Sequence, residues 1–249
     1  MQMFFINKVF VISIDKEELK ICDYGMRKQE IEYEEFEGVV DTNGAKGLNL
    51  TMIKLFKHCL EQNLQNVLIL EDDARWLIPK VSDFIMQCFP QLPKDYYCFH
   101  LGINLLTTPE RISENVLRVD QAFSSHAIIY SREGMEFILP LIEANTEIPY
   151  DITLRRSVQT IGKTYCTFPM ICTQRDRFSR IENKMTYWDS IMATTYAMHT
   201  KNIQSYPGHV GEIAKCYNGH MIDGIPPTIN PLIFEVQNKH LMGKIWKIL

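Results

Sequence analysis

The segment VLILEDD, residues 67–73, joins four consecutive aliphatic residues to three consecutive carboxylates. A short aliphatic run of this kind predicts a β-strand that is buried on both faces. Three like charges at the end of such a strand repel one another unless a cation neutralises them. The segment therefore predicts a core strand whose carboxyl end holds a cation.

Strand-like and helix-like patterns alternate over the first two thirds of the chain, which is typical of an α/β fold. Apolar residues at helical spacing between Leu48 and Leu60 predict an amphipathic helix that packs on the strand at 67–70. Further strands are expected at 9–14, 96–102 and 126–131, and further helices after Pro79, over 135–142 and from Asp151 onward. Pro140 disfavours a helix that continues beyond it.

The chain of 249 residues is long enough for one large domain. We expect a catalytic domain over 1–182 and, packed on it, a C-terminal extension over 183–249 that forms a lid and a tail. The extension is expected to be rich in loops because Gly and Pro are frequent between residues 200 and 231.

Composition narrows the classes of function. The net charge of −4 lacks the basic excess of a nucleic-acid-binding protein. The seven cysteines include no CxxC pair, which favours reduced thiols over a disulfide framework or a zinc site. No window is apolar enough to span a membrane, and the N-terminus lacks the features of a signal peptide. These observations favour a soluble, cytoplasmic protein.

The carboxylates at 71–73 stand where open α/β sheets bind ligands, at the carboxyl end of a strand. Hard oxygen ligands select Mg²⁺ or Mn²⁺, and such ions complete their coordination with substrate phosphates. If strand geometry continues, Glu71 and Asp73 share a face and Asp72 points to the other side. Asp73 is then the preferred metal ligand, while Glu71 or Asp72 contacts a ribose or holds the site together. The pattern alone does not separate phosphoryl transfer, glycosyl transfer and hydrolysis.

Five segments, in order, resemble the motifs of glycosyltransferase family 25, the lipopolysaccharide-type and collagen-type galactosyltransferases. They are VFVISID (9–15), NVLILEDDARW (66–76), SSHAIIYSREGMEFILPLI (124–142), IPYDITLRR (148–156) and FPMICTQRDRFSRI (168–181). Two features depart from the family pattern. Lys16 and Lys20 replace arginines, and a Ser-His step is missing before the helix at 48–60, where Thr51 is the nearest hydroxyl.

The resemblance implies a GT-A-like (Rossmann-like) mixed sheet flanked by helices, a UDP-sugar donor, a divalent metal and an inverting transfer. It implies that Asp73 and its neighbours form the metal and donor site, and that His126 and Asp151 lie on the acceptor side. Asp151 is then the general base that deprotonates the acceptor hydroxyl. The alternative for Asp151 is an N-cap of the helix that it opens.

Five other candidate residues each have two interpretations. Arg175 and Arg177 either clamp the donor diphosphate or form a solvated basic face. His126 either contacts a substrate or is a hydrogen-bonded structural residue. Asn104 either binds the acceptor or caps a turn. His209, between two glycines, either completes the metal shell or belongs to a plain turn.

The leading hypothesis is a Mn²⁺- or Mg²⁺-dependent hexosyltransferase that moves galactose, or another hexose, from a UDP-sugar to a glycan, lipid-linked or other hydroxyl acceptor. The alternatives are a glycosyltransferase acting on modified DNA bases, a nucleotidyl- or phosphotransferase, and an inactive sugar-binding domain. The absence of GxxxxGK[ST] weakens a P-loop version of the second alternative. The basic, Trp-containing segment 238–249 is either a docked helix or a weak contact with a membrane surface.

Overall fold

The computed structural model describes residues 3–179, 181 and 184–200. The chain divides into two units, Met1–His209 and Val210–Leu249, and all of the described residues belong to the first. Within them, no helix has both the length and the hydropathy needed to cross a membrane.

The centre of the first unit is an eight-stranded sheet with the order β2–β1–β3–β10–β5–β11–β8–β7. Its strands are β1 (Lys8–Ser13), β2 (Glu34–Glu37), β3 (Asn66–Glu71), β5 (Cys98–His100), β7 (Glu110–Arg111), β8 (Val116–Arg118), β10 (Ala127–Ser131) and β11 (Thr164–Thr167). β1 pairs in parallel with β2 and β3, and β5 with β11, whereas β10 is antiparallel to both β3 and β5. The sheet is therefore mixed, as the sequence predicted.

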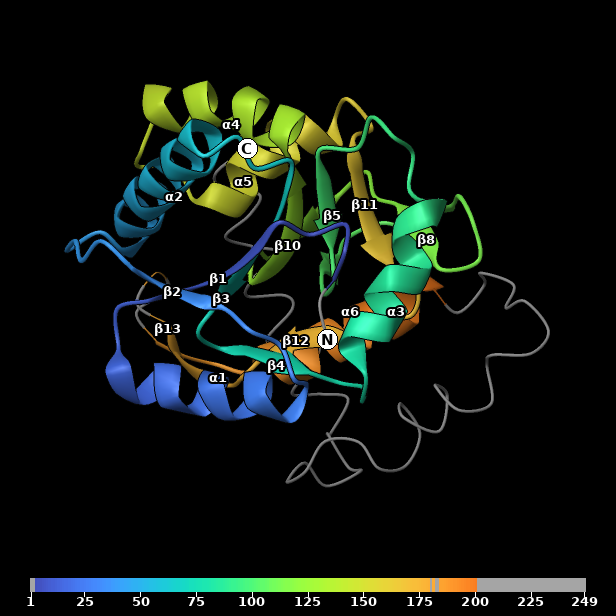
Figure 1. Ribbon diagram of the computed structural model, residues 1–249, viewed down its shortest axis with the longest axis horizontal. Coiled ribbons are helices and arrows are strands. Elements are labelled where there is room, and N and C mark those ends of the chain that lie inside the picture. Colours follow the sequence, from blue (N-terminus) through green and yellow to red (C-terminus); the bar gives the residue numbers. More distant parts are fainter. Residues whose placement is uncertain (1–2, 180, 182–183, 201–249) are drawn as a thin grey trace. The chain divides into compact units, whose positions relative to one another are not determined.

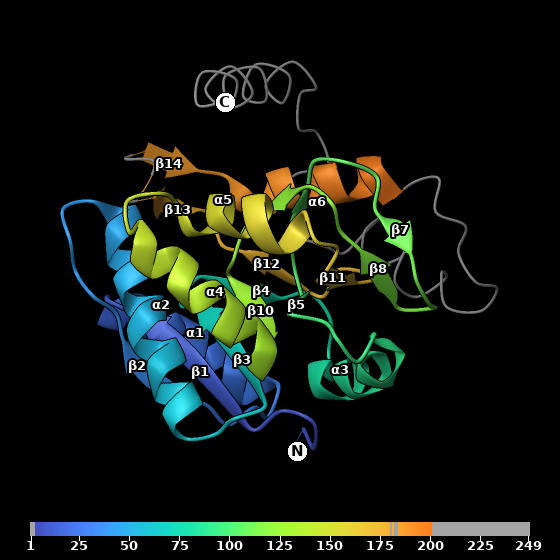
Figure 2. The ribbon, with the colours of Figure 1, turned by 90° about the horizontal axis from the view of Figure 1, so that it is seen from above.

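Helices cover both faces of this sheet (Figures 1 and 2). They are α1 (Lys16–Lys28), α2 (Gly44–Glu61), α3 (Val81–Cys88), α4 (Arg132–Ala144), α5 (Tyr150–Leu154) and α6 (Trp188–Thr200), with a 3₁₀ turn at Phe89–Gln91 and a π-helical turn at Arg155–Gln159. One core holds the buried side chains of α2, α4 and α5, and the other holds those of α1 and α3. The arrangement is a three-layer α/β fold.

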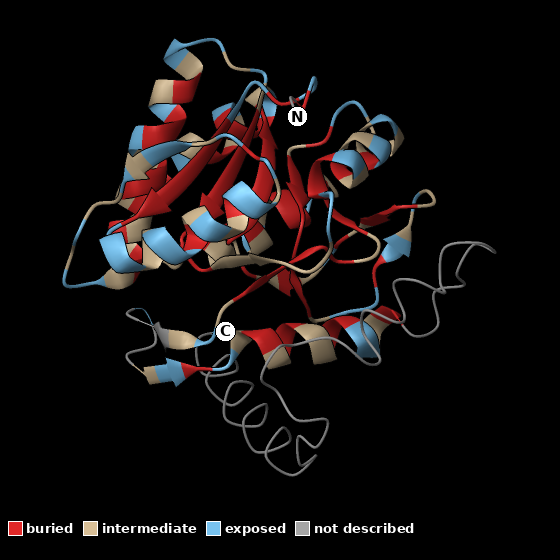
Figure 3. Ribbon diagram, turned by 60° about the horizontal axis from the view of Figure 1, so that its bottom comes forward, coloured by how far each residue is buried: buried red, intermediate tan, exposed pale blue. Residues whose placement is uncertain are grey.

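The four aliphatic residues of β3, at 67–70, are buried on both faces of the strand. Val67 and Ile69 belong to the core beneath α2 and α4, whereas Leu68 and Leu70 belong to the core beneath α1 and α3. All four are at most 2% exposed. In Figure 3 the central strands of the sheet are buried, and the exposed residues lie on the helices, loops and short strands around them. A strand with a core on each face has no polar side, so it does not alternate.

The predicted strands and helices are present at the expected places, with two differences in the helices. α4 continues through Pro140 to Ala144. The buried residues Met135, Ile138 and Ile142 lie on one side of this helix, and their burial outweighs the roughly 3 kcal/mol cost of an internal proline. The helix expected from Asp151 begins one residue earlier and turns π-helical after Leu154.

Two helices were not predicted from the sequence. α1 begins after Asp15, whose side chain accepts hydrogen bonds from the backbone of Glu17 and Glu18. These acidic residues in the first turn, with Arg27 and Lys28 in the last, are the standard signals of a helix. α6 lacks a clear amphipathic stripe because it is buried along much of its surface, against β6 and β12.

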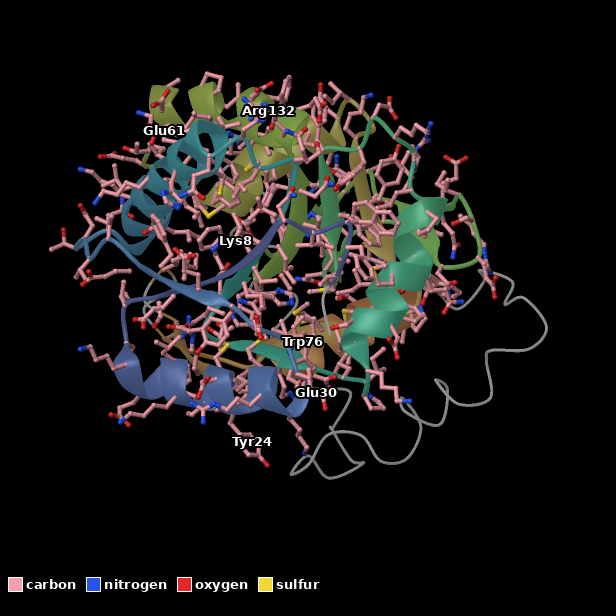
Figure 4. The ribbon with its side chains drawn as sticks, viewed as in Figure 1. Lys8, Tyr24, Glu30, Glu61, Trp76 and Arg132 are labelled. Atoms are coloured by element: carbon pink, nitrogen blue, oxygen red, sulfur yellow. The ribbon has the colours of Figure 1, made fainter. Side chains whose placement is uncertain are left out.

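Three short ribbons extend beyond the carboxyl edge of the sheet. They pair β4 (Ala74–Trp76) with β12 (Cys172–Gln174), β13 (Arg177–Ser179) with β14 (Lys184–Thr186), and β6 (Asn104–Leu105) with β9 (Ala122–Phe123). Trp76 anchors the first ribbon beneath α1, where a Cβ added to Gly25 would lie 4.0 Å from the Trp76 ring (Figure 4). The pairing of β12 with β4 places residues 174–177 beside the end of β3.

Candidate active site

Asp72 and Asp73 lie in the turn between β3 and β4, and both bind Arg177. Arg177 Nη1 is 2.6 Å from Asp72 Oδ1, and Arg177 Nε is 2.9 Å from Asp73 Oδ2. The expectation that the two aspartates point to opposite faces depended on continued strand geometry, and this condition does not hold, because β3 ends at Glu71. The turn brings both buried carboxylates to one guanidinium.

Ser13 fixes the second oxygen of Asp72. Its hydroxyl donates a hydrogen bond of 2.6 Å to Asp72 Oδ2, and the contact is buried. β1 and β3 run in parallel, with Ile12 beside Glu71, so the residues that follow them are neighbours. Sequence reasoning missed Ser13, although a hydroxyl directly after the aliphatic run of the neighbouring strand was the available signal.

Arg175 joins Asp72 and Asp73 to Glu18 of α1, and these side chains with Arg177 form a carboxylate cluster. Its guanidinium donates hydrogen bonds of 2.7 Å to the Asp72 carbonyl and 2.7 Å to the carboxylate of Glu18, and its backbone N–H donates to the Asp73 carbonyl at 2.8 Å. The Arg175 side chain is 18% exposed. Neither arginine therefore forms a solvated face, and both belong to the carboxylate cluster. Glu18 was missed with the helix that carries it.

Negative charge exceeds positive charge in this cluster at neutral pH, because the carboxylates of Glu18, Asp72 and Asp73 contact two guanidinium groups, those of Arg175 and Arg177. Burial is the largest cause that raises the pKa of Glu71 to about 8 and that of Asp73 to about 6, against the opposing effect of Arg177. Asp73 Oδ1 is also buried without a hydrogen-bond partner. Both features leave the cluster able to accept a further cation.

A divalent cation fits this donor set. The orphaned Asp73 Oδ1 and the neighbouring Asp72 are hard oxygen ligands, which Mg²⁺ and Mn²⁺ prefer. Among the described residues, no three or more His, Cys, Asp or Glu side chains form a group that could hold a metal ion by themselves.

Glu71 faces a different partner from the two aspartates. Ser125 Oγ donates a hydrogen bond of 2.8 Å to Glu71 Oε1, and the Glu71 N–H donates 2.8 Å to the carbonyl of His126. The backbone N–H of Ser124 donates to Asp151 Oδ2 at 3.5 Å. Two consecutive residues thus hold the carboxylates of Glu71 and Asp151, which come from β3 and α5.

The N-cap interpretation of Asp151 is wrong. The cap position of α5 is Pro149, which has no side-chain cap bond, and Asp151 is the second residue of the helix. Tyr150 fixes this helix by a hydrogen bond of 3.0 Å between its hydroxyl and that of Tyr130 in β10. Asn49 of α2 donates to the carbonyls of Thr146 and Ile148 in the preceding loop. The Asp151 carboxylate accepts a hydrogen bond from the turn at Ser124.

His126 and Asn104 are enclosed by the fold. The Asn104 amide oxygen accepts a hydrogen bond of 2.7 Å from Thr195 of α6. His126 is fully buried, and a Cβ added to Gly102 would lie 2.6 Å from its Nε2 and 1.9 Å from the Cys172 carbonyl oxygen. Asn104 thus links β6 to α6, and His126 is packed in the core, whereas Glu71, Ser125 and Asp151 are half-buried.

The buried histidines make one pH-dependent prediction. Burial lowers the pKa of His100 and of His126 from 6.5 to about 3. Between about pH 6.5 and pH 3 each histidine is therefore protonated in the unfolded chain and neutral in the folded chain. Over this range each histidine lowers the free energy of unfolding as the pH falls. The cost is about 2 kcal/mol per histidine at pH 5.

This cost is measured by comparing the wild type with His100→Gln in urea unfolding at pH 7 and pH 5. Gln does not titrate, so the stability of the variant relative to the wild type should rise by about 2 kcal/mol between the two pH values. The other titrating groups are the same in both proteins, so their contributions cancel when the two free energies of unfolding are subtracted. An unchanged difference would mean that His100 charges freely in the folded protein.

The structure thus brings together six of the candidate residues at the carboxyl edge: Glu71, Asp72, Asp73, Asp151, Arg175 and Arg177. His209 and the segment 238–249 lie outside the described residues, so their predicted roles as a metal ligand and as a membrane contact stay predictions.

No protein-family model matches this chain, and no curated protein matches its sequence. Similar solved structures include A197 from STIV, at 15% identity and a TM-score of 0.46, covering 71% of this chain and 91% of that one. A glycosyltransferase involved in the glycosylation of the major capsid of PBCV-1 is 10% identical, with a TM-score of 0.44 and coverage of 71% and 95%. A UDP-glucose pyrophosphorylase complexed with UDP-glucose is 11% identical, with a TM-score of 0.42 and coverage of 78% and 80%.

Proposed function

We propose that this chain is a nucleotide-sugar-dependent hexosyltransferase of GT-A-like fold that uses Mn²⁺ or Mg²⁺. The observation that carries the proposal is the buried pair Asp72–Asp73 at the carboxyl end of β3, with Asp73 Oδ1 unpartnered and more carboxylates than guanidinium groups around it. A site of this charge suits a cation that also binds a diphosphate. The donor is a UDP-sugar, with galactose as the first hexose to test.

On the donor side, Asp73 and Asp72 would hold the cation, which when bound would offset the charge that develops on the leaving diphosphate. Arg175 and Arg177 are the cations next to this position, and a planar guanidinium matches phosphate oxygens. Ser13 keeps the Asp72 carboxylate in one orientation through its buried hydrogen bond. These contacts fix the donor-side groups before any substrate binds. The charged side chains therefore need not rearrange during the reaction, which favours electrostatic stabilisation of the transition state.

On the acceptor side, Asp151 is the general base that takes the proton of the attacking hydroxyl. It is half-buried, and it shares the Ser124–Ser125 segment with Glu71. Glu71 therefore lies between the donor-side aspartates and the proposed base. A glycan or another polyhydroxylated acceptor would meet carboxylate and hydroxyl groups there.

The proposal is tested by differential scanning fluorimetry with UDP and Mn²⁺, followed by assays of nucleotide release from a panel of UDP-sugars. UDP with Mn²⁺ should raise the melting temperature of the wild type, and Asp73→Asn should abolish both the shift and the release. Asp15→Asn is a matched control, because Asp15 is a half-buried carboxylate at the end of the neighbouring strand and asparagine caps α1 equally well.

Two outcomes would contradict the hexosyltransferase proposal. A wild type that neither gains stability from UDP with Mn²⁺ nor releases nucleotide has no donor site of this kind. A protein that instead forms a nucleotide sugar and pyrophosphate from a nucleoside triphosphate and a sugar phosphate would be a nucleotidyltransferase.

A further inference from the structure

The backbone of Ser124 adopts a conformation that serine rarely adopts. Four non-glycine residues among those described have positive φ: Glu30, Asn63, Lys80 and Ser124. Glu30 and Asn63 follow the C-terminal ends of α1 and α2, where left-handed residues are common, and Lys80 is the N-cap residue of α3. Ser124, at φ 83°, adjoins no helix and lies at the carboxyl edge of the sheet. Left-handed residues away from helix ends and loop tips point to a local function.

Ser124 and Ser125 contact both of the half-buried carboxylates. The Ser124 N–H donates to Asp151 Oδ2, and the Ser125 hydroxyl donates to Glu71 Oε1. The left-handed turn at Ser124 changes the chain direction between β9 and β10, so that one donor faces α5 and the next faces β3.

A second connection fixes the turn to the element that carries Asp151. The buried side chain of Gln159, in the π-helical turn after α5, accepts a hydrogen bond of 2.9 Å from the Ala122 N–H and donates one of 3.1 Å to the Ala122 carbonyl. Ala122 belongs to β9 and precedes Ser124 by two residues. The turn is therefore connected to α5 through Ser124 and to the π-helical turn that follows α5 through Ala122.

We propose that Ser124 and Ser125 are positioning residues, which hold the Asp151 and Glu71 carboxylates in a fixed relation through the left-handed turn. This inference rests on the proposed function, in which Asp151 is the base. Neither serine reacts. Their effect is to keep the base within reach of the acceptor hydroxyl, and a misplacement of about 1 Å at such a group can cost about 10²-fold in rate.

The experiment compares Ser124→Val with Ser124→Gly. Valine is β-branched and resists positive φ, whereas glycine accepts it without strain and keeps the N–H. Ser124→Val should lower kcat by about 10- to 100-fold with the KM for the UDP-sugar unchanged, and Ser124→Gly should keep kcat within about twofold of the wild type. Ser125→Ala should lower kcat by about 10-fold.

Ser157→Ala is the matched control, because the Ser157 hydroxyl bonds only to the carbonyl of Thr153 in its own helical segment. It should leave kcat and KM unchanged. The melting temperature with UDP and Mn²⁺ verifies that each variant is folded and binds the donor. A Ser124→Val variant that binds the donor and turns over at the wild-type rate would overturn the proposal, as would a Ser124→Gly variant as slow as Ser124→Val.

A second measurement needs no turnover. Amide hydrogen exchange of Ser124 should be faster in Asp151→Ala than in the wild type, while the amides of β10 keep their protection. If exchange at Ser124 does not change, the contact with Asp151 is absent and the positioning role fails. If exchange changes but the wild type transfers no hexose, the proposed function fails and the contact stands.

Discussion

Asp151→Asn should lower the rate of hexose transfer by about 10²- to 10⁴-fold, the range by which a general base contributes. Asparagine keeps an oxygen that can accept the hydrogen bond from the Ser124 N–H, so the geometry of the turn should survive. Its amide cannot take up the proton of an acceptor hydroxyl. The loss should therefore appear in kcat, measured as nucleotide released at saturating UDP-sugar and acceptor.

The same variant should bind UDP with Mn²⁺ as the wild type does, because the proposed metal ligands Asp72 and Asp73 are held by Arg177, whereas Asp151 accepts a hydrogen bond from Ser124. Isothermal titration calorimetry gives this comparison directly. Full transfer activity in Asp151→Asn would assign the base to another residue, and Glu71, bound to the same turn, would be tested next. Lost donor binding in a folded variant would instead move Asp151 to the donor side.

Arg177→Ala should lower the free energy of unfolding by about 2 to 4 kcal/mol. Removing one partner of a buried ion pair leaves the other charge without compensation, and Arg177 serves two carboxylates at once. The aspartate side chains are 5% and 3% exposed, whereas that of Arg177 is 30% exposed, so water screens part of the loss. Urea unfolding at pH 7 without divalent metal measures the difference.

Arg27→Ala is the matched control, since the Arg27 side chain is 79% exposed and pairs with Asp23 within one helix. It should change stability by less than about 0.5 kcal/mol. Mn²⁺ should restore part of the stability lost in Arg177→Ala, because the ion neutralises the same carboxylates. A variant as stable as the wild type without metal would show that Asp72 and Asp73 do not depend on Arg177.

The strands and the location of the site were predictable because both depend on local patterns. An aliphatic run marks a strand with a core on each face, and carboxylates directly after it mark the edge where parallel strands end. Arg175 and Arg177 were identified as charged groups in a loop-like stretch, but no local pattern shows that β12 pairs with β4 and brings them to Asp72 and Asp73. Local signals were available for Ser13 and for the helix that carries Glu18, but their contacts with the cluster are distant in sequence and have no local pattern.

The sequence by itself determined the α/β class, the buried strand at 67–70 and the presence of excess negative charge at its carboxyl end, since each follows from neighbouring side chains. Only the tertiary structure decided which partner each of the three carboxylates contacts. The chain turns after Glu71, so Asp72 and Asp73 meet Arg177, whereas Glu71 meets Ser125 and, through the same segment, Asp151. A side chain's direction after the end of a strand depends on the turn and on what packs against it, and those partners lie from 54 to 105 residues away along the chain.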